Sequence, residues 1–346
     1  GTSNRMNFDA KLQLPVFTWG RISGTIAISD IGKGISNTLD KQQRVNLTEQ
    51  VIRAYYSVLL NHKVIQLDRE NYERAQKFMK ITEERFSAGG IPRLELLRGE
   101  VQLQNSLSQL EDARGNLRKS RLFLANTLGI DTTGVKVEGT FTSRPLRVNE
   151  QAVIDKALQT RSDLNLLQLQ NKINNEQISI SRSGNKPNVV LFSGYNVQNG
   201  FDPINPDKFI DNWNAGVQIA FPLFDGFATG HKVQNARLEV QKTRLQETEI
   251  RDLIILQIRQ AITTLNQAAE KISSQEENIK LAAQALQIAE EQYRLGVASS
   301  LDVLNAQQTL SQSEMMHTQA IFNHIMSKLE LSRAMEDFTW FEAELE

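Results

Sequence analysis

The sequence contains no cysteine among its 346 residues, which excludes disulfides, a thiol nucleophile and cysteine-based metal sites. No run of eighteen or more apolar residues occurs, so the sequence holds no candidate for a membrane-spanning helix. Acidic and basic residues nearly cancel, with a formal net charge of −1, so the composition does not indicate a broad nucleic-acid surface, and we expect no nucleic-acid partner. Glycine and proline are confined to short segments and are missing from 231–295. That distribution is typical of long helices joined by brief irregular segments.

Motifs of the common enzyme classes are missing as well. The sequence has no HExxH, no GxSxG and no phosphate-binding glycine loop. Acidic residues are scattered along predicted helices, which is typical of a solvated face. His317 and His324 lie seven residues apart without a further ligand in the same pattern, which is too little for a metal site. We therefore expect no enzyme activity, no catalytic residues, no bound metal and no cofactor.

The sequence does contain an internal duplication. Four pairs of similar residues are each 207 positions apart: Pro15 and Pro222, Gly89 and Gly296, Glu95 and Asp302, Leu122 and Leu329. A constant spacing over more than a hundred residues indicates two copies of one structural unit. Each copy has a strand, a long helix, a glycine-containing turn and a second helix. The second copy is preceded by a further strand and helix, so we expect the chain to begin partway through its first copy.

The duplication predicts the domain boundaries. The first repeat is predicted at 1–130, with a strand at 6–16 and a helical hairpin at 35–128 whose tip is 87–92. An intervening segment with a helix follows at 131–183. The second repeat is predicted at 184–337, with strands at 187–198 and 212–221 and a hairpin at 226–337 whose tip is 295–300; 338–346 is a tail. A helix over 231–295 would span roughly 100 Å, longer than globular domains use.

The predicted strands have one apolar and one polar face, because side chains alternate along a strand. One face carries Phe8, Ala10, Leu12 and Leu14 in the first strand and Trp213, Ala215, Val217 and Ile219 in the last. Two interpretations remain open: a half-buried sheet in a soluble domain, or a lipid-facing barrel with a wet interior. Even small barrels need about eight strands, so the second interpretation requires several chains to pool their strands.

These residues resemble the TolC-like outer-membrane efflux proteins. Three motifs carry the resemblance: PLFDG at 222–226, ALQTRSDLNLLQLQ at 157–170, and the tip pattern of Gly296, Ser299, Asp302, Val303 and Leu304. Ser162 stands in the second motif where the family usually has proline.

The resemblance implies a mainly helical fold with a small β part. Tandem helical hairpins of a homotrimer would form an α-barrel continuous with a twelve-stranded outer-membrane β-barrel. The implied function is a passive export duct of a tripartite efflux or type I secretion system. Its partners would be a periplasmic adaptor, an inner-membrane pump reached indirectly, and outer-membrane lipid. Two alternatives are a periplasmic helical-hairpin adaptor and a soluble coiled-coil scaffold.

The hairpin tips are the predicted functional site. Gly89 and Gly296 fit helix C-caps, Ser299 and Asp302 form a capping-box pattern, and Pro92 suits the first helical position. By resemblance, the periplasmic gate would comprise Asp302, Glu95, Asn305 and Tyr293. Asn305 stands where some family members carry a second acid, so only one acidic ring per repeat is expected. The adaptor would contact Ala88, Gly89, Gly90, Ile91, Pro92, Gly296, Val297, Ala298 and Ser299.

Overall fold

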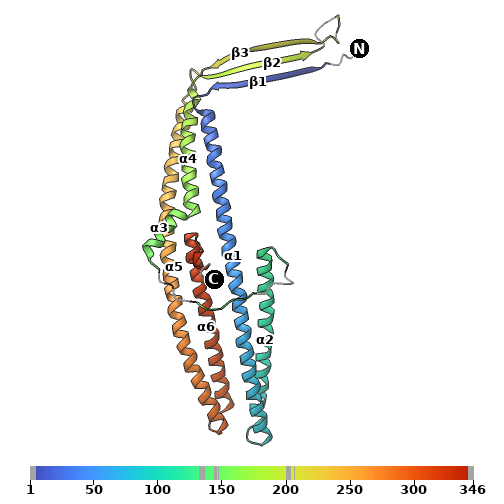
Figure 1. Cartoon of the computed structure of the whole chain (residues 1–346), viewed down its shortest axis with the longest axis vertical. Coiled ribbons are helices and arrows are strands. Elements are labelled where there is room, and N and C mark those ends of the chain that lie inside the picture. The colour runs from blue at the N-terminus through green and yellow to red at the C-terminus, as the bar shows by residue number, and fades with distance from the viewer. Residues whose placement is uncertain are drawn as a thin grey trace. The chain divides into compact units, whose positions relative to one another are not determined.

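The structure is a computed structural model that describes residues 5–131, 137–143, 146, 148–199, 204–205 and 207–341. Its elements, in chain order (Figure 1), are β1 (Asn7–Phe17), α1 (Arg21–Ser87), α2 (Arg93–Leu128), α3 (Glu150–Thr160), α4 (Ser162–Arg182), the short 3₁₀ helix η2 (Ser183–Asn185), β2 (Asn188–Gln198), β3 (Ile210–Ala220), α5 (Ala228–Arg294) and α6 (Ser300–Met335). The predicted mainly helical fold with a small sheet is confirmed. Contacts divide the chain into a strand unit, 1–40 with 162–251, and a hairpin unit, 41–161 with 252–346.

The helix boundaries repeat with the spacing found in the sequence. Helices α1 and α5 both have 67 residues, α2 and α6 both have 36, and each pair is displaced by 207 positions. The strand-to-helix junctions repeat too. Trp19 and Gly20 both have positive φ, as do their equivalents Gly226 and Phe227. Both copies therefore keep the same backbone conformation, although glycine is the second residue of the junction in the first copy and the first residue in the second copy.

The strand unit contains a three-stranded antiparallel sheet in the order β1-β2-β3 (Figure 1). Its register aligns apolar side chains in rows across the strands: Ala10 with Tyr195 and Trp213, and Leu14 with Leu191 and Val217. The opposite face is polar, with Asp9 beside Asn196 and Asn212. The apolar face is exposed, since Leu14, Leu191 and Val217 have exposed fractions of 58%, 41% and 60%.

The first strand, predicted at 6–16, is observed at Asn7–Phe17, so Pro15 lies inside it. Pro15 pairs with Val190 and Phe17 with Val189, so Val16 is an extra residue and forms a β-bulge. Pro15 lies on an edge strand next to this bulge, where the missing N–H can be tolerated.

The predicted start of the first long helix at residue 35 was wrong, because α1 begins at Arg21. Glycines in the early part of α1 permit close packing against α4. A Cβ atom on Gly24 would lie 2.9 Å from Ile180 Cγ1, and one on Gly34 would lie 3.6 Å from Leu169. The glycines therefore mark a tight helix–helix contact and do not break the helix.

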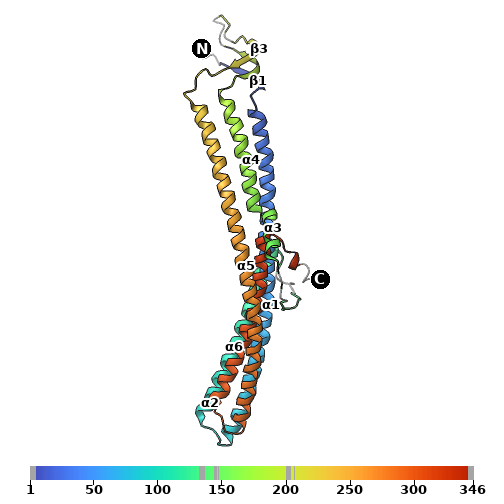
Figure 2. The ribbon, with the colours of Figure 1, turned by 90° about the vertical axis from the view of Figure 1, so that its left-hand side faces the viewer.

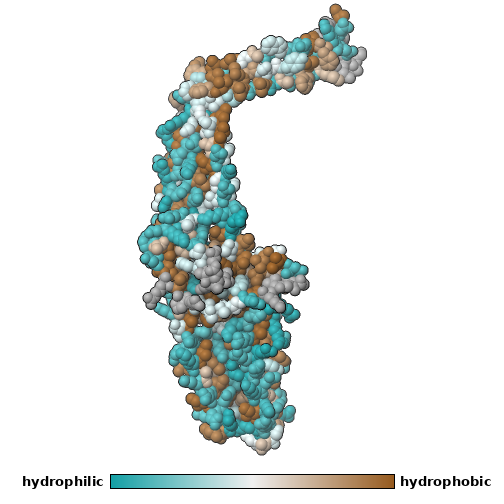
Figure 3. Space-filling view, in the orientation of Figure 1, coloured by the Kyte–Doolittle hydropathy of each residue, from teal (hydrophilic) through white to brown (hydrophobic). Residues whose placement is uncertain are grey.

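The hairpin unit packs α1 between α2 and α6. The turns of the two hairpins lie at the same end of this unit in both side views (Figures 1 and 2). Tyr56 and Leu59 of α1 pack with Ile325 and Leu329 of α6 in a buried cluster. The drawn face of this unit is mostly hydrophilic, with apolar residues in narrow patches (Figure 3). Among the described residues, no helix combines the length and apolarity needed to cross a membrane.

Candidate functional site: the hairpin tips

Both helical hairpins turn through the same hydrogen-bonding pattern. Gly89 (φ +69°) and Gly296 (φ +79°) adopt the left-handed conformation that ends many helices. Two N–H groups of each turn donate back to the preceding helix: Gly89 to Phe86 and Gly90 to Arg85 in the first turn, Gly296 to Tyr293 and Val297 to Gln292 in the second. This is the Schellman arrangement, which satisfies carbonyl groups left free at a helix end.

The two helices that leave the turns begin differently. Ser299 caps α6 with a complete capping box, since the Ser299 N–H donates to Asp302 Oδ2 at 2.9 Å and the Ser299 hydroxyl accepts from the Asp302 N–H. The Ser299 hydroxyl also donates to Asp302 Oδ2 at 2.7 Å. These bonds lower the pKa of the Asp302 carboxyl below its usual value. Asp302 is therefore charged at neutral pH and is already bonded to its own helix end.

Pro92 is the N-cap of α2 and makes no side-chain cap bond. Its predicted place at the first helical position was therefore wrong by one residue. Glu95 lies in the first turn of α2, where a negative charge favours the helix dipole.

Tyr293 is buried and joins the two hairpins. Its exposed fraction is 2%, and its ring centroid lies 5.4 Å from that of Phe78 on α1. The Arg85 guanidinium stands 4.5 Å from the same ring centroid and donates to the Tyr293 carbonyl oxygen at 2.5 Å. The Tyr293 hydroxyl lies 3.5 Å from Thr82 Oγ1. A cation over a buried aromatic face is attractive, so these contacts hold the ends of α1 and α5 together.

The other predicted gate residues are not gathered around Tyr293. Asp302 and Asn305 are exposed and Glu95 is partly buried. Sequence reasoning missed Arg85, because its partner is 208 positions away and no spacing distinguishes it from other basic residues of the same helix.

The predicted adaptor-contact residues are mostly solvent-exposed. Ile91 and Ala298 are the partly buried members of the set, and Ala298 packs against the cluster that contains Tyr293 and Val303. Val297 has an exposed fraction of 78%, next to Leu295 at 70%. The second tip therefore presents apolar side chains to its surroundings. Among the described residues, there is no cluster of three or more His, Asp or Glu side chains able to hold a metal.

Tandem helical hairpins with repeated tips, attached to a small antiparallel sheet with one exposed apolar face, define the class of this protein. The chain belongs to the outer membrane efflux protein family, whose model matches residues 1–130 and 153–335. This family consists of channels and not enzymes, and it differs from the periplasmic adaptors and soluble scaffolds that the sequence left open.

Individual relatives are distant in sequence and close in fold. Nodulation protein T of Rhizobium leguminosarum bv. trifolii is 21% identical over 276 residues, which cover 78% of this chain and 59% of the relative. Outer membrane protein TolC of Escherichia coli (strain K12) is 21% identical over 325 residues, which cover 90% of this chain and 65% of TolC. The chain thus spans less than two thirds of either relative. A CusC crystal structure matches with a TM-score of 0.83 at 16% identity, covering 98% of this chain and 79% of CusC, which shows the shared fold.

Proposed function

We propose that the chain is the outer-membrane channel of a tripartite efflux or type I secretion system, a passive duct through which cargo leaves the cell. The observation that carries the proposal is the uncovered apolar face of the β1-β2-β3 sheet in a chain of this family. Each strand has 11 residues, the length of a tilted membrane-crossing strand. An apolar face toward lipid and a polar face toward water are what such strands require.

Export tests this function directly. The protein would be produced with its adaptor and pump in a Gram-negative host that lacks channels of this family. Restored export, and a protein that leaves the outer-membrane fraction only with detergent, are the expected results. Release into buffer without detergent would contradict the membrane assignment.

We further propose a homotrimer in which the sheets of three copies join into one barrel. A twelve-stranded barrel would need four strands from each copy, one more than the three strands of the described residues. Strands β1 and β3 are both edges of the sheet. Unpaired backbone groups at such edges are costly in lipid, and a closed barrel removes them. Neighbouring copies can supply the missing partners.

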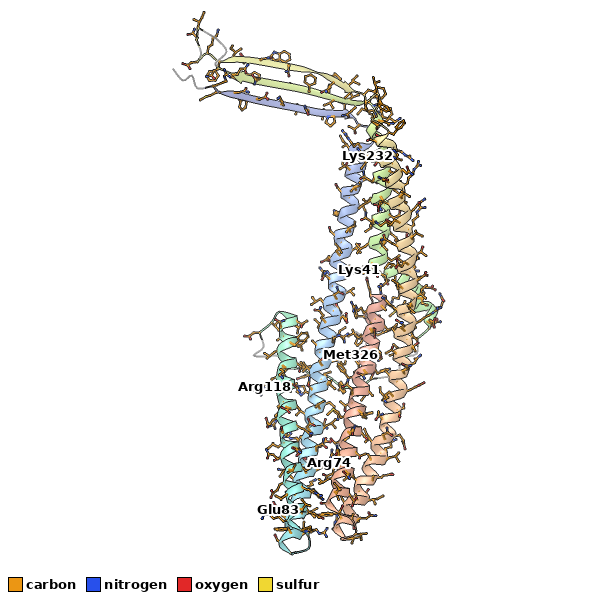
Figure 4. All side chains as sticks on the ribbon, turned by 180° about the vertical axis from the view of Figure 1, so that it is seen from behind. Lys41, Arg74, Glu83, Arg118, Lys232 and Met326 are labelled. Carbon is orange, nitrogen blue, oxygen red and sulfur yellow. The ribbon has the colours of Figure 1, made fainter. Side chains whose placement is uncertain are left out.

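The duplication indicates how neighbouring copies would pack. Within one chain, α1 packs on α6, and Arg74 of α1, which is labelled in Figure 4, forms an ion pair of 2.7 Å with Glu314 of α6. Because the repeats are displaced by 207 positions, α5 is the equivalent of α1 and α2 the equivalent of α6. We therefore propose that α5 of one copy packs on α2 of the next. The equivalents of Arg74 and Glu314 are Leu281 and Leu107, so both members of the ion pair are replaced by apolar residues.

Asp302 is the proposed gate residue with an exposed charge. Three copies of Asp302 around one opening would attract cations and titrate as a coupled set. Asp302→Ala should change single-channel conductance in lipid bilayers and weaken block by multivalent cations. Thr309→Ala, two helical turns further along α6, exposed and uncharged, is the matched control. Equal conductance and equal cation block in the Asp302 variant, the control variant and the unaltered protein would mean that Asp302 does not contribute to the gate.

The tips are the proposed contact with the adaptor. Gly296→Leu should disrupt adaptor coupling, because it places a large side chain on the exposed second turn, whereas trimers should remain. The substitution also forces a side chain into a left-handed conformation, at a cost of about 1–2 kcal/mol. Gly129→Leu controls for that strain, since Gly129 (φ +67°) caps the other end of α2. Cross-linking to the adaptor measures coupling, and export by the Gly296 variant at the level of the control would argue against a tip contact.

A further inference from the structure

A groove in the hairpin unit lies apart from the tips and is not used by the proposed channel function; its lining mixes apolar side chains, Val64, Ala113 and Met315, with polar ones. Its volume is about 420 Å³, and α1, α2 and α6 all line it. Its oxygen-bearing side chains include Asp68 of α1, Asp112 and Gln109 of α2, and Gln308 and Gln312 of α6. No Lys, Arg or His is found among the described residues that line it.

Asp68 is the unusual member of this groove. Its exposed fraction is 8%, and within the part of the chain that the structure describes its carboxylate makes no hydrogen bond or ion pair. Burial raises the pKa of Asp68 above its usual value. The Asp68 carboxylate therefore meets the groove and not a protein partner. A largely buried carboxylate that lacks a compensating charge is destabilised, and a cation bound in the groove is one way to supply that charge.

Arg74, a cationic side chain beside this groove, already has a partner. Arg74 lines an adjoining groove that shares Gln109, Gln308 and Ser311 with this one. Its guanidinium pairs with Glu314 at 2.7 Å and donates to Asn71. Arg74 is therefore neutralised by Glu314, and the charge of Asp68 is left uncompensated.

The second repeat has uncharged residues at the positions equivalent to Asp68 and Asp112. The equivalents of Asp68 and Asp112 are Gln275 and Gln319. Gln275 is also buried, with an exposed fraction of 6%, so a neutral amide is compatible with packing at this position of the long helix. The two carboxylates are thus specific to the first hairpin, where both face the same groove.

We propose that this groove binds a divalent cation, with Ca²⁺ as the best match. The Asp68 and Asp112 carboxylates supply the charge, and the amide oxygens of Gln109, Gln308 or Gln312 together with water complete the shell. Ca²⁺ accepts six to eight oxygen ligands in flexible geometry, and sites with few carboxylates have dissociation constants of about 10⁻⁴–10⁻³ M. A cation here would join α1 and α2 of the first hairpin to α6 of the second.

Calcium titration of the purified full chain in detergent tests this site. Calorimetry should show one Ca²⁺ per chain with a dissociation constant of about 1 mM or lower. Asp68→Asn, which keeps the size of the side chain, should weaken binding at least tenfold. The double variant Glu276→Gln/Glu277→Gln removes two exposed carboxylates from α5 and should bind Ca²⁺ as the unaltered protein does.

Two results would overturn the proposal. One is the lack of saturable binding up to 10 mM Ca²⁺ in protein whose circular dichroism shows intact helices. The other is equal binding by Asp68→Asn and by the unaltered chain. If Ca²⁺ does not bind and thermal stability rises as the pH falls toward the raised pKa of Asp68, the groove holds a proton in place of a cation.

Discussion

Replacing Leu281 with arginine is expected to prevent ring assembly, and adding Leu107→Glu is expected to restore it. Leu281 has an exposed fraction of 57% in the single chain and would face Leu107 of the next copy. A lone arginine there would be buried without a partner, at a cost of about 3–5 kcal/mol. The double variant would recreate between copies the ion pair that Arg74 and Glu314 form within one chain.

Light scattering of the detergent-solubilised protein measures this effect as the fraction of trimer. Gln284→Arg adds the same charge on the same helix, and its equivalent Lys77 is exposed, so this control should remain trimeric. Leu107→Glu alone should disassemble the trimer as Leu281→Arg does. The proposed α5–α2 contact would be contradicted if both single variants kept the trimer fraction of the unaltered protein. It would also be contradicted if the double variant had a trimer fraction no higher than that of either single variant.

Arginine at Val217 is expected to prevent stable membrane insertion. Val217 lies in a row with Leu14 and Leu191 on the apolar face of the sheet. Arginine on the lipid-facing side of a barrel near the bilayer midplane costs about 2–4 kcal/mol. With three copies in one barrel, the cost applies three times. The fraction of protein recovered in the outer membrane, and its resistance to unfolding by urea, should both fall.

The neighbouring position provides the control for this experiment. Gln218 pairs with Val190 and lies on the opposite face of the same strand, next to the row of Gly216 and Phe192. Gln218→Arg places the same charge on the face that would meet water in the proposed barrel, where it should be tolerated. Equal recovery of the two variants from the outer membrane would mean that the face carrying Val217 does not contact lipid.

Much of this fold could be predicted because the signals are local or repeated. The 207-residue spacing located both hairpins, and the alternation around Trp213 identified a strand that the structure extends over 210–220. The start of α1 could not be predicted in this way. Gly24 and Gly34 have low helix propensity, and only their packing against α4 explains why the helix continues through them.

The contacts of the tips were less predictable than their shape. Glycine and the Ser299–Asp302 pattern are read within a few residues, and the structure has both the turn and the capping box. The position of the Tyr293 ring depends on Phe78 and Arg85, more than two hundred residues earlier. The sequence of the helix around a tyrosine does not predict which distant side chains will pack against its ring. Asp68 was missed for a similar reason, because the groove in which its carboxylate lacks a protein partner is formed by three helices, α1, α2 and α6.

The contact between Tyr293 and Arg85 determines how many parts of the proposed gate can move independently. The equivalent positions across the boundary between copies are Phe86 and Gln292, which lack the hydroxyl and the guanidinium. In the proposed trimer, the two tips of one chain would therefore be coupled more strongly than tips that belong to different chains. In a trimeric opening, the two hairpin tips of each chain would move together as one rigid unit, and the weaker contacts would lie between neighbouring chains. Partial opening would therefore occur one whole subunit at a time.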